Sequence, residues 1–121
     1  MSMHLISSIL VALVAIEHSL IMVAEMWFWR TPWVMERFRP KPGTVECPAV
    51  YAANQGLYNG FLAAGLFWSI LSNAHGLELK IFFLVCVIVA GIYGAVTVKP
   101  QILLVQSVPA GLALATTLLG R

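Results

Sequence analysis

Charged residues are scarce in this chain of 121 residues. Lysine and arginine together number 7 and aspartate and glutamate 5, so that 10% of the sequence is charged and 60% is hydrophobic. A soluble globular domain usually carries about a quarter charged residues. The mean hydropathy of +0.90 points the same way. The composition excludes an ordinary soluble domain and predicts a single transmembrane domain over residues 1–121.

Cysteine and basic residues are equally sparse. Cys47 and Cys86 form no Cys-x-x-Cys pair, which argues against a redox dithiol or a structural zinc site and favours two free thiols over a disulfide. The formal charge of +2 is too small for nucleic-acid binding, and no basic stripe with interleaved aromatic residues is present. We expect no nucleic acid among the partners. A Gly-rich phosphate loop and a nucleophile elbow are absent as well.

Four stretches approach the 20 or so apolar residues that are needed to cross the hydrocarbon core of a bilayer. They cover residues 4–29, 50–72, 79–98 and 101–119. The region before residue 5 lacks lysine and arginine, and apolarity continues to Trp29, so the first stretch is predicted to be a retained helix rather than a cleaved signal peptide. The fold class predicted is all-α, an integral membrane four-helix bundle.

The linker over residues 30–49 and the break at Lys99-Pro100 must lie on the same side of the membrane. Together they hold five of the seven basic residues, namely Arg30, Arg37, Arg39, Lys41 and Lys99. Under the positive-inside rule this side is cytoplasmic and both termini are extracytoplasmic. We therefore expect a multi-pass protein of the cell inner membrane.

A short interfacial helix is predicted inside this linker. Thr31 would be its N-cap, and Pro32 would occupy the first helical position, where its missing N–H costs nothing. Trp27, Trp29 and Trp33 would mark the cytoplasmic interface.

Two carboxyl groups and an imidazole lie within the first apolar stretch: Glu17, His18 and Glu25. At about 100° per residue, His18 and Glu25 share a helix face, whereas Glu17 lies on another. A charge at the bilayer centre costs about 2.5 to 3.5 kcal/mol or more, so such residues usually face the protein interior and often mark function. All three are candidate catalytic residues for proton transfer. The alternatives are interhelical hydrogen bonds and, for Glu25, headgroup contact or pairing with Arg30.

The second stretch has a polar side and a small-residue side. Gly56 and Gly60 allow a neighbouring helix to approach closely. The opposite side supplies amides and a tyrosine that could orient a ligand, although amides also serve as structural hydrogen bonds and tyrosines as packing or interfacial residues. With one tyrosine from the third stretch, the candidate ligand-binding residues are Asn54, Gln55, Tyr58, Asn59 and Tyr93.

The polar residues of all four stretches lie at matching depths in the cytoplasmic half. This matching predicts one intramembrane polar pocket that opens toward the first linker. No metal site is predicted, because Glu17 and His18 point in different directions and no second histidine has ligand spacing. The sequence specifies no cofactor.

Several blocks of the sequence are similar to a known family. EHSLIMVAEMWFW, NQGLYNGFLAAGLFW and GIYGAVTVKPQILLVQSVPA resemble a bacterial family of small inner-membrane proteins known as a domain of unknown function, DUF1304. The resemblance implies four helices and an inner-membrane location and transfers no activity. A looser similarity connects the chain with membrane-associated glutathione transferases, but their Arg-rich glutathione-binding pattern is missing.

Three functions stay open at this stage. The first is a site that binds or transforms a lipophilic or amphipathic small molecule by proton transfer. The second is a proton- or solute-conducting membrane protein, and the third is a structural or regulatory membrane subunit. The expected partners are the lipid bilayer, a lipophilic ligand and further copies of the chain in a homo-oligomer.

Overall fold

A computed structural model describes residues 1–43 and 47–121, and every regular element in these residues is helical. Its elements are α1 (Met3–Trp27), α2 (Pro32–Arg37), α3 (Ala49–Leu71), α4 (Gly76–Thr97), a π-helical segment η1 (Leu103–Ser107) and α5 (Val108–Leu119). Each of the four predicted stretches is helical, with its ends shifted by no more than three residues. Residues 44–46 of the predicted linker lie outside the described residues.

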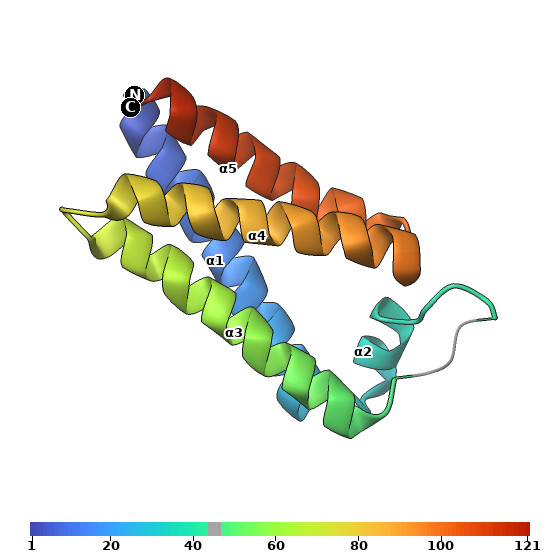
Figure 1. The fold of residues 1–121 in the computed structure, drawn as a ribbon. Helices are drawn as coiled ribbons and strands as arrows, with labels where there is room; N and C mark the ends of the chain where they lie inside the picture. Colours follow the sequence, from blue (N-terminus) through green and yellow to red (C-terminus); the bar gives the residue numbers. More distant parts are fainter. Residues whose placement is uncertain (44–46) are drawn as a thin grey trace.

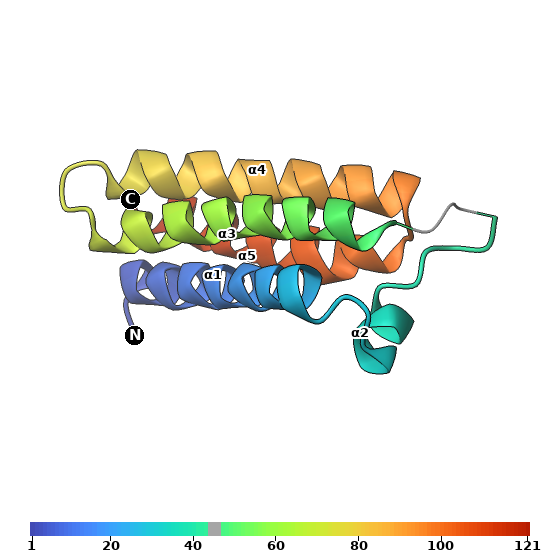
Figure 2. The ribbon, with the colours of Figure 1, turned by 90° about the horizontal axis from the view of Figure 1, so that it is seen from below.

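The long helices lie side by side, with both termini at one end and the linker at the other (Figures 1 and 2). α1 and α3 run together along their length. α4 and α5 diverge from this pair toward the linker end, as Figure 1 shows. All four long helices therefore gather near the termini, whereas the linker end is divided into an α1–α3 pair and an α4–α5 pair.

The hydrophobic core draws on all four long helices. α1 contributes Val11, Val14 and Ala15, α3 contributes Leu66, and α4 and α5 contribute Leu84, Val87, Ala110 and Ala113. The α1 residues follow the three- and four-residue spacing of one helix face. His18 continues the same face one turn further on, so helical periodicity places its imidazole inside the protein.

Polar contacts join the helices near the termini. The hydroxyls of Ser7 in α1 and Thr117 in α5 lie 2.7 Å apart and are buried. Lys80 in α4 donates from Nζ to Ser8 Oγ of α1 at 3.1 Å. A buried hydrogen bond of this kind contributes about 1 kcal/mol. These contacts hold both α4 and α5 against α1.

The π-helical segment η1 precedes a proline. Pro109 has no N–H to donate, so regular α-helical bonding cannot continue through it. The N–H of Val108 bonds to the carbonyl of Leu103, a five-residue step that defines a π-turn. Ser107 donates from Oγ to the carbonyl of Ile88 at 2.9 Å and so attaches this wide turn to α4.

Hydrogen bonds attach the linker to the α1–α3 pair and to α4 at the end of the protein where these helices separate. Trp29 donates from Nε1 to the carbonyl of Cys47 at 3.0 Å. Lys41 donates from Nζ to the carbonyl of Val96 at 3.2 Å, at the end of α4. The linker thus connects the α1–α3 pair to α4 where the helices themselves separate.

Helix α2 confirms the short helix predicted after Thr31. Pro32 stands in its first turn as expected. Thr31 is the N-cap of α2, as predicted, and its carbonyl accepts from the N–H of Met35 at 2.9 Å. Its side chain makes no capping bond, and Oγ1 donates to the carbonyl of Phe28 at 2.7 Å. The hydroxyl therefore satisfies a carbonyl near the end of α1 instead.

Two of the described helices, α1 and α4, are long and apolar enough to cross a membrane. At about 1.5 Å per residue, the 25 residues of α1 extend about 37 Å, more than the roughly 30 Å hydrocarbon core. The apolar helix at Leu103–Leu119 is shorter. α3 has 23 residues and no charged side chain, but its amides, tyrosines and glycines lower its apolarity, and it is not among these two helices.

The contact between α4 and η1 depends on a glycine. A Cβ at Gly91 would lie 2.9 Å from the backbone nitrogen of Ser107 and against its Oγ, whereas a Cβ at Gly111 would meet nothing within 4 Å. We predict that Gly91→Ala lowers the stability by about 1 to 3 kcal/mol through overpacking. Gly111→Ala, the matched control, should be neutral or stabilising because alanine favours helix. Thermal unfolding in detergent measures both, and equal melting temperatures would contradict the prediction.

Candidate functional site

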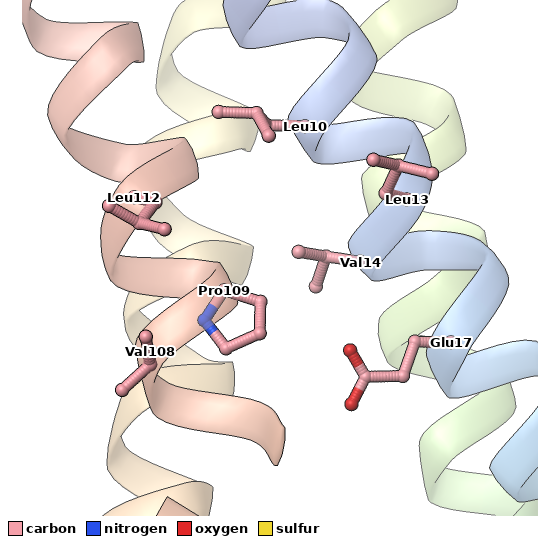
Figure 3. A pocket seen from close by; sticks show the side chains of 7 residues that line it. All are labelled: Leu10, Leu13, Val14, Glu17, Val108, Pro109 and Leu112. Carbon is pink, nitrogen blue, oxygen red and sulfur yellow. The ribbon is translucent and has the colours of Figure 1, made fainter. Parts of the chain in front are cut away.

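A pocket of about 170 Å³ lies between α1 and α5. Its lining is apolar except for one carboxyl group, that of Glu17. In Figure 3 this carboxyl points from α1 across the pocket toward Pro109. The other lining residues are Leu10, Leu13, Val14, Val108 and Leu112.

Glu17 has an unsatisfied buried oxygen. Its Oε1 is shielded from solvent and makes no hydrogen bond in the described part of the chain. A buried polar atom without a partner costs about 1 to 3 kcal/mol, and native proteins retain few of them. The carboxyl is therefore a candidate contact for a molecule that fills the pocket.

His18 is fully buried, with 0% of its surface exposed. Its Nδ1 lies 3.0 Å from the carbonyl oxygen of Val14, and a carbonyl only accepts, so Nδ1 carries the hydrogen. Nε2 has no partner among the described residues. Neighbouring positions on α1 thus carry two unsatisfied polar atoms, although His18 faces the core and does not line the pocket.

Glu25 lies nearer the linker and is 9% exposed. Its Oε1 accepts from Nδ2 of Asn59 at 3.3 Å, so its partner is an amide of α3, and Arg30 is exposed. Helix α3 approaches α1 so closely here that a Cβ at Gly56 would lie only 3.0 Å from the Cβ of Glu25. This contact confirms the close approach predicted for the small-residue side of α3.

The negative charge of Glu25 affects the thiol of Cys47 in the linker. Burial, and then the negative charge of Glu25, raise the pKa of the Cys47 thiol. Cys47 and Cys86 are both free thiols, as predicted.

The predicted ligand-binding residues do not gather around Glu17 and His18. Asn59 alone among them bonds to a predicted catalytic residue. Asn54 and Gln55 are exposed, as is Tyr58 at 52%. Tyr93, on α4, is 71% exposed. The polar side of α3 thus faces outward, because its small-residue side packs against α1.

The sequence reasoning missed the α5 wall of the pocket. Val108, Pro109 and Leu112 are apolar, and apolar residues do not stand out within an apolar helix. The sequence did hold one signal for this wall, which is Pro109 inside the predicted span 101–119. A proline within a helix marks a break in the backbone hydrogen bonding. Metal ligation is a poor fit for this arrangement, because no three side chains of the metal-binding types gather within residues 1–43 and 47–121.

The fold and the site define an all-helical protein with an apolar pocket that contains a single carboxyl group. Over residues 12–118 the chain matches the family described as protein of unknown function (DUF1304), and it belongs to this family. It is similar to "Uncharacterized protein YpaA" of Lactococcus lactis subsp. lactis (strain IL1403), with 32% identity over 114 residues, 93% of this chain and 96% of that protein. No solved structure matches the chain.

The two glutamates of α1 should respond oppositely to replacement. Glu17→Leu removes a half-buried carboxyl with one unsatisfied buried oxygen from apolar surroundings, so we predict an increase in stability of about 1 to 3 kcal/mol. Glu25→Leu, the matched control on the same helix, removes the acceptor of Asn59 and should lower stability by about 1 kcal/mol. Thermal unfolding in detergent measures both changes. A destabilised Glu17→Leu protein would show that the carboxyl has a structural partner.

Proposed function

We propose that the chain is a multi-pass four-helix bundle of the cell inner membrane, with both termini on the extracytoplasmic side. Two helices long and apolar enough to span a membrane support this placement. Further support comes from the basic residues around the linker and the turn after α4, because positive charge favours the cytoplasmic side. In this orientation α2 and Trp33 lie at the cytoplasmic interface.

Within the membrane, the protein binds a lipophilic or amphipathic small molecule in the pocket between α1 and α5. The observation that carries this proposal is the unsatisfied, buried Oε1 of Glu17 in an otherwise apolar lining. The apolar walls would hold a hydrocarbon part of the ligand, and the carboxyl would bind its polar group. If the ligand is transformed, the step is a proton transfer to or from Glu17, the only lining residue that can exchange a proton.

The volume of the pocket limits what it can hold. An engineered cavity of about 150 Å³ accommodates one benzene molecule. The pocket, at about 170 Å³, is of similar size. The buried part of the ligand is thus one ring or a short branched alkyl group, and the rest extends toward the lipid through the open side.

Conduction of protons is less well supported by this geometry. The next buried polar pair along the α1–α5 contact is Ser7 with Thr117. Between that pair and Glu17, the pocket wall consists of Leu10, Leu13 and Val14, which neither donate nor accept protons. A ligand site needs no continuous polar path, and for this reason we favour it.

Two probes of similar shape test the site. Para-butylphenol offers a hydroxyl to Glu17, and butylbenzene does not. In lipid nanodiscs, the protein should retain at least about tenfold more of the phenol, because a hydrogen bond to a carboxylate contributes about 1.5 to 3 kcal/mol. Native mass spectrometry of the released protein measures retention, and Glu17→Leu should abolish the preference.

Leu112→Trp, which fills the pocket, should reduce retention of both probes, whereas Val89→Trp on the exposed side of α4 should not. Comparing variants in the same lipid cancels the partition of each probe into the bilayer. Equal retention by the wild type, Glu17→Leu and Leu112→Trp would contradict the proposed site.

A further inference from the structure

The outer face of α3 differs from the other outward surfaces of the protein. We define it by six exposed residues: Tyr51, Asn54, Gln55, Tyr58, Phe61 and Trp68. These residues follow helical three- and four-residue spacing on the side away from α1. On α4, by contrast, the exposed residues from Phe82 to Ile92 are apolar and suit contact with lipid. The exposed polar residues of α4 lie near its two ends, at Glu78, Tyr93 and Thr97.

The polar groups of this face lack partners. No side chain of Asn54, Gln55 or Tyr58 bonds to another described residue. From the start of α3 at Ala49, Asn54 lies about 8 Å and Tyr58 about 14 Å along the helix. If α3 starts at the membrane surface, the face reaches almost to the middle of a 30 Å hydrocarbon core, where lipid offers no hydrogen bonds.

We infer that a second copy of the chain covers the outer face of α3, in a parallel dimer with α3 against α3. Two copies inserted in the same orientation are related by an axis along the membrane normal. Each residue near this axis therefore faces its own counterpart at the same depth. The inference rests on the membrane placement proposed above.

The chemistry of the face suits such self-pairing. An amide both donates and accepts, as does a tyrosine hydroxyl, so each group can bond to an identical group. A charged side chain would repel its counterpart, and α3 carries none over its 23 residues. Interhelical amide contacts of this kind stabilise helix association in membranes. The two tyrosines, Phe61 and Trp68 add aromatic contact area on the same line.

Cysteine crosslinking in native membranes tests the dimer. The background chain carries Cys47→Ser and Cys86→Ser. In this chain, Phe61→Cys should give an oxidised product of twice the chain mass. The replacement leaves the amides of Asn54 and Gln55 in place. Val89→Cys, equally exposed but on α4, is the matched control and should give none. Adding Asn54→Leu and Gln55→Leu to Phe61→Cys should lower the crosslinked fraction about tenfold. An unchanged melting temperature in detergent would show that the double replacement leaves the fold intact.

The outcomes separate the two proposals. Protein that resists extraction by alkaline carbonate but gives no product through Phe61→Cys would overturn the dimer and leave the membrane placement standing. A product of any mass other than twice the chain would likewise overturn it, in favour of a different partner. Protein washed from the membrane by carbonate would overturn both proposals.

Discussion

The close approach of α1 and α3 is the constraint on which the rest of the structure depends. At Gly56 a Cβ would lie 2.8 Å from the side chain of Met26, and at Gly60 it would lie 2.5 Å from the sulfur of Met22. These methionine side chains can move aside, but a Cβ at Gly56 would also lie 3.0 Å from the backbone oxygen of Met22. The tight packing against this backbone favours glycine, and the small-residue side of α3 faces α1. Asn59, at the edge of this contact, then reaches Glu25, and the remaining polar side chains of α3 are left facing outward.

The α1–α5 contact differs from the α1–α3 contact because it includes a buried polar atom, Oε1 of Glu17, that no group in the described chain satisfies. Near the termini the contact is completed by the Ser7–Thr117 hydroxyl pair. Further along, Pro109 interrupts the regular bonding of the last helix and lines the pocket that Glu17 faces. Proteins that satisfy local rules elsewhere usually break them where they bind or react. Oε1 of Glu17 breaks the rule that buried polar atoms are paired, whereas Oε1 of Glu25 is bonded to Asn59.

Most of the helical content and part of the site could be predicted from the residues alone. Long apolar stretches separated by proline and polar linkers located the helices, and helical periodicity separated Glu17 from His18 and Glu25. Depth, however, says how far along a helix a residue lies and nothing about the direction in which it points. Asn54 and Tyr58 have the depth of Glu25 and His18, yet they face away from both, since the glycines of α3 determine its rotation.

The sequence by itself determined the all-helical class, the small-residue side of α3 and the burial of His18. These properties follow from local composition and from the 3.6-residue period, which any helix obeys. Only the tertiary structure decided that Glu25 bonds to Asn59 and that Glu17 faces α5 across an apolar pocket. Such pairings depend on the rotation and divergence of whole helices. Contacts summed over their full length set these quantities, and no single stretch of sequence encodes them.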